Sequence, residues 1–186
     1  MDRMDGSIEL KSKAGVGTTG IVKIPFKIGT QDNNSNLSDR PVSLDDYSVE
    51  GMRALVVEDN ELNIEISRCI LEDSGMEVTC AADGQEAVEI FEKSALDYFG
   101  VIYMDVMMPR MNGLDAARTI REMKRRDARS VPIIAMSANA FAEDIINSQL
   151  AGMNAHLAKP LDAEKMIVAL KQCMADNSDV KLHEDL

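Results

Sequence analysis

The sequence lacks any apolar run near the roughly 20 residues that a membrane-spanning helix needs. It also does not open with the charged and then apolar pattern of a signal peptide. The three cysteines, Cys69, Cys80 and Cys173, are odd in number and include no Cys-x-x-Cys pair. We therefore expect reduced thiols in a cytoplasmic protein without direct membrane contact, rather than a disulfide framework or a cysteine metal site.

Basic residues are also scarce. Twenty Lys and Arg stand against 32 Asp and Glu, for a formal net charge of −12. This charge argues against non-specific binding to nucleic acid or to an anionic membrane. The hydrophobic fraction of 45% is enough for a packed core. A length of 186 residues fits one ordinary domain with an additional segment of several dozen residues.

Most of the chain alternates short apolar runs with amphipathic stretches. The runs predict strands at residues 53–57, 76–81, 100–104, 131–137 and 155–158. Helices are predicted between Asn60 and Gly75, at 84–93, from Gly113 onward, at 141–152 and at 162–174. Because parallel neighbours need a crossover connection, this alternation predicts a parallel sheet covered on both faces. We predict an α/β, doubly wound, flavodoxin-like fold of five strands in the order 2-1-3-4-5.

Two local helix features accompany this fold. On the first helix, Leu62, Ile66, Cys69 and Ile70 share one face by helical spacing. The basic cluster at 124–129, "KRRDAR", is expected at the solvated C-terminal end of the third helix, where cations suit the helix dipole. A partner-docking role is the alternative interpretation of that cluster.

Polar residues stand where the predicted strands end. Glu58 and Asp59 follow the first strand, Asp105 follows the third, Ser137 ends the fourth and Lys159 follows the fifth. In an open parallel sheet, ligands bind outside the carboxyl ends of the strands. We therefore expect three carboxylates, a hydroxyl and an ammonium at one edge of the sheet.

This combination favours phosphoryl chemistry. Three neighbouring carboxylates repel one another and an incoming phosphoryl group, and Mg²⁺ or Mn²⁺ bound to them relieves both repulsions. Asp105 is then a candidate nucleophile that forms an acyl phosphate. Lys159 and Ser137 are candidates to hold phosphoryl oxygens. The turn after Asp105 makes the main-chain carbonyl of Met107 a candidate further metal ligand.

Taken singly, each of these residues has a simpler explanation. An acid at a strand end is commonly a solvated helix cap, Ser137 alone could be a turn hydroxyl, and Lys159 alone a surface charge. Their joint arrangement favours the phosphoacceptor. A phosphatase of the haloacid-dehalogenase type also uses an aspartate and Mg²⁺, but its motif follows the first strand and reads DxD. Here the acceptor follows the third strand and reads "DVMM".

Four motifs carry a resemblance to a known family. "VVEDN", "YMDVMMPRMNG", "MSANA" and "HLAKP" occur in the order found in receiver domains of bacterial two-component response regulators. The resemblance spans residues 52–174. It implies that Asp105 is the phosphorylation site, that Asp59 binds the metal directly, and that Glu58 acts largely through water. It also implies metal binding by the Met107 carbonyl and a cis Lys159–Pro160 bond.

His156 departs from the family pattern. Receivers usually carry Tyr or Phe at this position, and that ring turns inward on phosphorylation. Either the imidazole only packs on the strand edge, or it retains a switching role together with Ser137 as a smaller, titratable ring.

The first fifty residues predict a hairpin-like extension and a linker. Residues 6–28 read as two strands around a Gly-rich loop, with Val22, Ile24, Phe26 and Ile28 alternating on one face. This stretch resembles the last two strands of the histidine-kinase ATPase domain. The resemblance is carried by Gly6, Ile8, Ser12, Gly15, Gly17, Thr18 and Pro25. Gly20 departs from it, because it stands where Phe is expected.

The resulting organisation is an ATPase-domain remnant at 1–29, a polar linker at 30–50, a receiver at 51–175 and an acidic tail at 176–186. It resembles the C-terminal end of a hybrid sensor histidine kinase, whose parent protein could be anchored in a membrane. The nucleotide-binding segments of such a kinase are not recognisable here, so we expect no ATP-dependent kinase activity from these residues. Only Mg²⁺-dependent phosphorylation and dephosphorylation at Asp105 is expected.

Two functions remain open at this point. In the first, the receiver is a phosphorelay intermediate that takes a phosphoryl group from a histidine kinase and passes it to a histidine phosphotransfer protein. In the second, it is a stand-alone switch that binds a partner when phosphorylated. The kinase-like N-terminal stretch favours the relay, and the tail is expected to be too short for an output domain that binds DNA.

Overall fold

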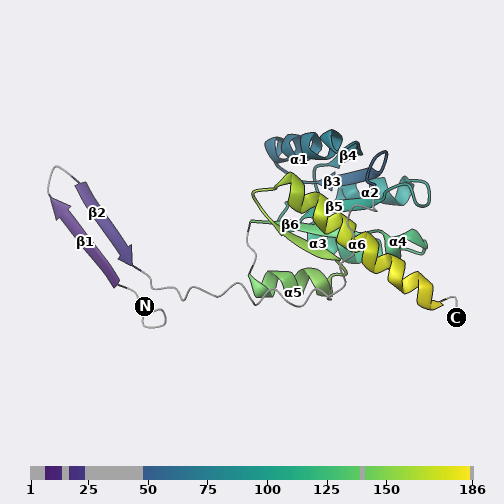
Figure 1. The fold of residues 1–186 in the computed structure, drawn as a ribbon. Helices are drawn as coiled ribbons and strands as arrows, with labels where there is room; N and C mark the ends of the chain where they lie inside the picture. Colours follow the sequence, from purple (N-terminus) through teal and green to yellow (C-terminus); the bar gives the residue numbers. More distant parts are fainter. Residues whose placement is uncertain (1–6, 14–16, 24–47, 139–140, 185–186) are drawn as a thin grey trace. The chain divides into compact units, whose positions relative to one another are not determined.

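The computed structural model describes residues 7–13, 17–23, 48–138 and 141–184 of the chain (Figure 1). The chain divides into two compact units, Met1–Pro41 and Val42–Leu186. In the first unit, β1 (Ser7–Lys13) and β2 (Gly17–Lys23) pair antiparallel, with Ser7 opposite Lys23. The predicted pair of strands is therefore confirmed. The expected alternation at Ile24, Phe26 and Ile28 lies outside the described residues.

The second unit contains a five-stranded parallel sheet. Its strands are β3 (Arg53–Val57), β4 (Glu77–Ala81), β5 (Val101–Asp105), β6 (Ile133–Ser137) and β7 (Ala155–Ala158). They lie in the order β4-β3-β5-β6-β7. Counted within this unit, that is 2-1-3-4-5, so the predicted doubly wound topology is confirmed.

Helices connect these strands, and side-chain caps mark where several of them begin. They are α1 (Glu61–Asp73), α2 (Gly84–Lys93), α3 (Gly113–Glu122), α4 (Asp127–Ser130), α5 (Ala142–Leu150) and α6 (Ala163–Glu184). Asn60, Asp83 and Asn112 accept hydrogen bonds from backbone N–H groups in the first turns of α1, α2 and α3. Such caps satisfy donors that have no partner within the helix.

The core has two layers, one on each face of the sheet. On β5, Ile102 and Met104 pack in a cluster with Phe91 of α2 and Ile120 of α3. The alternate residue Tyr103 packs in the other cluster, which includes residues of α1 and α6. Because successive strand residues point to opposite faces, a strand buried on both faces reads as a continuous apolar run. All five residues of β5 and of β6 are buried.

The apolar face expected on α1 is largely exposed. Leu62 is 69% and Ile66 is 42% exposed, and Cys69 is also exposed. Ile70 alone of the four packs against the core as a partly buried residue. The buried residues of α1 are Ser67 and Leu71. Helical spacing identified a shared face, but the sheet contacts a different one.

The C-terminal boundary also differs from the prediction. The last helix was expected to end near residue 174 and to be followed by an acidic tail, whereas α6 continues to Glu184. Residues 176–184 are therefore helical.

The interpretation of the cluster at 124–129 as a solvated helix end is wrong for Arg125. Helix α3 ends at Glu122, and the Arg125 side chain is only 12% exposed. Its guanidinium donates to the carbonyl oxygen of Phe91, within the last turn of α2, and to that of Ala95, just beyond the end of the helix. It also lies 4.4 Å above the Phe91 ring. It also pairs with buried Asp127 at 2.7 Å. A cation at the C-terminal end of a helix is favourable, but the helix it caps is α2.

Because of the Arg125–Asp127 ion pair, we expect the free energy of unfolding to depend on pH. Hydrogen bonds from the Arg125 guanidinium, together with the Asp97 backbone N–H, lower the Asp127 pKa to about 2. Because this folded-state pKa lies below the unfolded value of about 3.9, the pair stabilises the fold above about pH 4, and this contribution is lost as the pH falls towards 2. Asp127→Asn should lower the free energy of unfolding by roughly 1–2 kcal/mol at neutral pH, measured by urea denaturation.

The loss should shrink below about pH 4, where the wild-type carboxylate begins to protonate. Glu89→Gln is a matched control, because its pair with Lys93 is exposed and should contribute little. An equal loss for Asp127→Asn at every pH would contradict the assignment.

Candidate functional site

The sheet brings the predicted site residues to one edge. Asp105 lies beside Met136 in the register of β5 and β6, and Ser137 lies beside Ala158 in that of β6 and β7. Glu58 directly follows β3, and Lys159 directly follows β7. The expected convergence at the carboxyl ends of the strands is therefore present.

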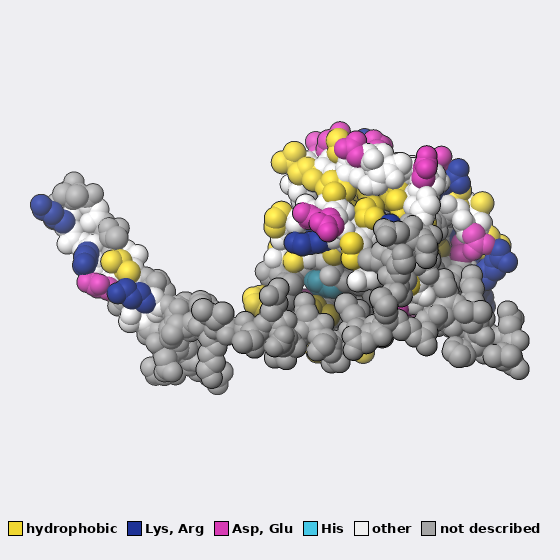
Figure 2. Space-filling view, viewed as in Figure 1, with side chains coloured by type: hydrophobic (Ala, Val, Ile, Leu, Met, Phe, Trp, Pro, Cys, Tyr) yellow, Lys and Arg dark blue, Asp and Glu magenta, His cyan; other side chains and the backbone are white. Residues whose placement is uncertain are grey.

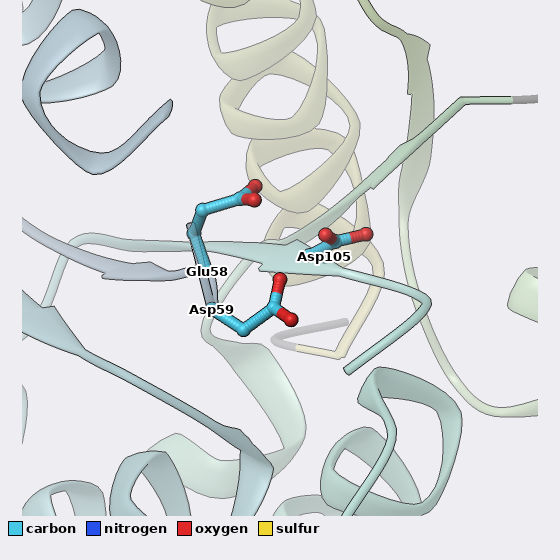
Figure 3. A group of neighbouring side chains, drawn as sticks. All are labelled: Glu58, Asp59 and Asp105. Carbon is cyan, nitrogen blue, oxygen red and sulfur yellow. The ribbon is translucent and has the colours of Figure 1, made fainter. Parts of the chain in front are cut away.

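Three carboxylates form the centre of this edge (Figure 3). Glu58, Asp59 and Asp105 each offer one oxygen, and these oxygens all lie within 4.8 Å of one another. Glu58 and Asp105 are buried, at 1% and 5% exposure, whereas Asp59 is exposed. Buried carboxylates at this separation are unfavourable unless positive charge or hydrogen-bond donors compensate them.

Lys159 supplies part of that compensation. Its Nζ lies 2.7 Å from Asp105 Oδ2 and 2.5 Å from Glu58 Oε2. Partial burial by itself would lower the Lys159 pKa, but hydrogen bonds to the two carboxylates outweigh it and raise the pKa above its usual value. The side chain is therefore an ammonium. The Lys159–Pro160 bond is cis, as the resemblance implied, and the Lys159 N–H donates to the Ser137 carbonyl at 2.8 Å.

Backbone and side-chain donors hold the remaining oxygens. The Met107 N–H donates to Asp105 Oδ1 at 3.1 Å, and the Asn63 amide donates to Glu58 Oε1 at 2.9 Å. Met107 therefore contacts the site through its backbone N–H, and the residue as a whole is 76% exposed.

The donor set fits a hard divalent cation. Three carboxylates and one ammonium leave a net charge of −2 among these four groups. Mg²⁺ prefers oxygen ligands and is commonly bound through one or two carboxylates with water and phosphate oxygens. Glu58, Asp59 and Asp105 present such oxygens together.

Ser137 and His156, predicted from the sequence, are in direct contact. His156 Nε2 lies 2.8 Å from Ser137 Oγ. His156 Nδ1 lies 3.1 Å from the hydroxyl of Ser148 on α5, and that hydroxyl donates to the Asp144 carbonyl at 2.8 Å. Sequence reasoning missed Ser148, which is 1% exposed. The sequence feature that could have identified Ser148 is its position three residues before the buried Ala151, on the side of an amphipathic helix that faces the core.

Gly113 keeps α3 close to the acceptor. Its N–H donates to the Val106 carbonyl at 3.1 Å. A Cβ at this position would overlap the carbonyl oxygen of Asp105. The backbone at Asp105 can hold its place only if residue 113 has no side chain.

Comparison with known proteins places these observations in a family. The family described as response regulator receiver domain matches residues 54–171. A solved receiver domain of a sensor histidine kinase from Pseudomonas aeruginosa PAO1 is 37% identical and has a magnesium ion coordinated in its active site cleft. The match covers 67% of this chain and 98% of that one, with a TM-score of 0.60.

Two further relatives bear on partners and on the N-terminal stretch. The receiver domain of Ssk1 from Saccharomyces cerevisiae was solved with the histidine phosphotransfer protein Ypd1. It is 29% identical, with 63% of this chain and 84% of that one covered and a TM-score of 0.57. The sensory/regulatory protein RpfC of Xanthomonas campestris is 30% identical over 191 residues, which cover 91% of this chain and 26% of RpfC. The chain spans between 7% and 26% of the length of the curated relatives that it matches.

The close approach of Gly113 to the Asp105 backbone leads to a testable prediction about stability. Gly113→Ala should lower the free energy of unfolding by roughly 1–3 kcal/mol, because the added methyl group displaces the Asp105 backbone. Helix propensity alone predicts the opposite sign, a gain of roughly 0.5–1 kcal/mol. Chemical denaturation distinguishes the two, and an unchanged or increased stability would contradict the close approach. The Asp105 amide resonance should shift in the folded variant.

Proposed function

The chain belongs to the response regulator receiver domain family, and on this basis we propose that Asp105 accepts a phosphoryl group from a phosphohistidine in a two-component phosphorelay. The observation that carries this proposal is the position of Asp105. It is a buried carboxylate at the carboxyl edge of the sheet, within reach of two further acids and paired with Lys159.

Transfer to Asp105 forms a bond between a carboxylate oxygen and phosphorus as the bond from phosphorus to the donor's imidazole nitrogen breaks. The nitrogen retains the electron pair. Glu58, Asp59 and Asp105 would hold Mg²⁺ or Mn²⁺, with the Met107 carbonyl as a further ligand. When bound, this ion neutralises the charge of the phosphoryl oxygens and the acids.

The other residues act on the phosphoryl group directly. Lys159 is the ammonium that already lies against Asp105, so it would pair with a phosphoryl oxygen on that carboxylate. Ser137 ends the neighbouring strand and is 4% exposed, so its hydroxyl would donate to another phosphoryl oxygen. Lys159 and Ser137 both already lie at the edge of the sheet that carries Asp105.

A relay is better supported than a stand-alone switch, because an apolar surface adjoins the acceptor. We define the α1 patch as Leu62 and Ile66, which are 69% and 42% exposed. Hydrophobic side chains gather over α1 in Figure 2. A hollow of about 120 Å³ connects Ile66 to Lys159, Pro160 and Leu161. A histidine phosphotransfer protein docked on this surface would bring its histidine close to Lys159 and so to Asp105. A protein of that kind was crystallised with the Ssk1 receiver.

The parent protein is proposed to be a hybrid histidine kinase. Residues 1–29 would be the end of its ATPase domain, 30–50 a linker, 51–175 the receiver and 176–186 a C-terminal extension. The RpfC alignment supports this assignment, because it covers 91% of the chain and so extends beyond the receiver match. The antiparallel pair β1 and β2 is consistent with it. Along the described parts of the chain, no helix has both the length and the apolar character to cross a membrane. We propose a cytoplasmic location, where the kinase donor has ATP.

The first prediction from this function concerns the acceptor itself. Incubation with a small acyl phosphate and Mg²⁺ should add one phosphoryl group to the wild-type chain, detected by intact-mass spectrometry. Asp105→Asn should take none, because an amide is not a carboxylate nucleophile. Chelation of the metal should also abolish labelling. Full labelling of the Asn variant, or labelling in chelator, would refute the mechanism.

The second prediction concerns the α1 patch. Ile66→Lys should slow phosphoryl exchange with a histidine phosphotransfer protein by roughly fivefold, because a charge replaces an apolar side chain of the proposed docking surface. Labelling by the small acyl phosphate should be unchanged. Ile146→Lys is the matched control, since Ile146 is 53% exposed on α5, which does not line the hollow beside Lys159. Equal exchange rates for the two variants would show that the α1 patch is not the docking surface. Absence of any exchange with the wild-type chain would favour the stand-alone switch.

A further inference from the structure

The segment between β5 and α3, residues 106–112, carries the main chain of Met107 beside the acceptor. At its start the Met107 N–H donates to Asp105 Oδ1 at 3.1 Å. At its end the Gly113 N–H donates to the Val106 carbonyl at 3.1 Å. We call this segment the acceptor loop. Its conformation determines where the Met107 carbonyl lies relative to the three carboxylates.

An ion pair ties the middle of the acceptor loop to the corner between β4 and α2. The Arg110 guanidinium pairs with the carboxylate of Asp83, the residue that caps the start of α2. Asp83 is 0% exposed, whereas the Arg110 side chain is 70% exposed. Because a buried carboxylate without a counter-charge is unfavourable, the pair holds Arg110, and with it the loop, against this corner.

The α2 side of this contact is fixed by reciprocal hydrogen bonds. The Glu86 N–H donates to Asp83 Oδ1 at 2.9 Å, and the Glu86 carboxylate accepts from the Ala82 N–H at 2.8 Å. These two bonds resemble a capping box, which satisfies backbone donors where a helix begins. With Oδ1 held in this way, Asp83 presents its other oxygen, Oδ2, to Arg110.

Two backbone features indicate that the acceptor loop is held in one conformation. Arg110 has a φ of 63°, in the left-handed region that residues other than glycine rarely adopt. Such a conformation persists where the surrounding contacts determine it. The Gly84 N–H donates to the Met111 carbonyl at 3.1 Å, and a Cβ at residue 84 would lie 2.6 Å from that oxygen. The corner at Asp83 and Gly84 therefore contacts two successive residues of the loop.

We propose that Arg110 is a positioning residue for the cation site. Its ion pair with Asp83 fixes the acceptor loop in the conformation that presents the Met107 carbonyl to a divalent cation bound by the three carboxylates. This inference rests on the proposed function, in which that cation is Mg²⁺ or Mn²⁺. Arg110 and Asp83 act through the backbone of the loop rather than as ligands.

Charge alone and positioning predict opposite results at Arg110. Arg110→Met removes a positive charge, so a purely electrostatic effect would strengthen cation binding. Loss of positioning instead weakens it, because one ligand of the cation is no longer held in place. We expect the dissociation constant for Mg²⁺ to rise about three- to tenfold, at or below the low end of the range for residues that orient metal ligands.

Asp83→Asn separates the ion pair from the helix cap. Asparagine caps helices about as well as aspartate, so α2 should be retained while the negative charge is lost. Its effect on Mg²⁺ binding should resemble that of Arg110→Met. Because both variants break the same contact, the double variant should bind Mg²⁺ about as weakly as either single variant, rather than showing the product of two losses.

The experiment uses the full chain, with Mg²⁺ alone as the probe. Isothermal titration calorimetry gives the dissociation constant. Hydrogen exchange of the Gly84 amide, measured in metal-free buffer, reports whether the loop stays against the corner, because this amide donates to Met111. Exchange should be faster in Arg110→Met and in Asp83→Asn than in the wild type.

Arg118→Met is the matched control. Arg118 pairs with Asp115 at 2.7 Å on α3, the helix that follows the acceptor loop, and its side chain is 49% exposed. This variant loses the same charge as Arg110→Met. It should neither weaken Mg²⁺ binding nor speed the exchange of the Gly84 amide.

Two results would overturn the positioning role. One is a dissociation constant in Arg110→Met equal to or below that of the wild type, and Asp83→Asn gives the same test if Arg110→Met does not fold. The other is a double variant whose loss is the product of the two single losses. Absence of Mg²⁺ binding in the wild-type chain would refute the proposed function and the positioning role with it, whereas the Gly84 exchange rates would still show whether the ion pair holds the loop.

Discussion

The repulsion between carboxylates at the sheet edge is the constraint on which the rest of the site depends. Glu58 and Asp105 are buried close together, and Lys159 bridges them at 2.5 and 2.7 Å. One ammonium does not balance three acids, so the edge retains an affinity for a cation and, through it, for a phosphoryl group. The parallel sheet makes this possible, because it brings residues from three separate strand ends to one point and holds them on a rigid scaffold.

Two structural routes lead away from the acceptor, and they have different characters. Towards α1 the surface is apolar and exposed at Leu62 and Ile66, which suits a partner that must reach Asp105 itself. Towards α5 the route is a buried series of hydroxyls and an imidazole, whose proton positions depend on one another.

Much of the fold and site could be predicted because the information is local. Buried strands such as 101–105 read as continuous apolar runs, and Asn60 is a capping residue at the start of α1. The site residues were recognisable because they stand at strand ends. Other features had no local signal. The spacing of Leu62 and Ile66 defines one face of α1, but spacing does not say whether that face meets the sheet or the solvent. Arg125 lies in a charged run that is typical of a solvated surface, yet it caps the distant helix α2.

The sequence by itself determined the order and type of the elements, the sheet topology, and the set Glu58, Asp59, Asp105, Ser137 and Lys159 that the topology brings together. Hydrophobic periodicity and the residue types at strand ends are local properties of a few residues. They can therefore be recognised without knowing how the side chains pack. The tertiary structure alone decided which side of α1 is exposed, that Arg125 contacts the end of α2, and that Ser148 contacts His156. These depend on how far each helix is rotated about its axis against the sheet. That rotation is set by the sum of many small contacts between segments that are distant in the chain.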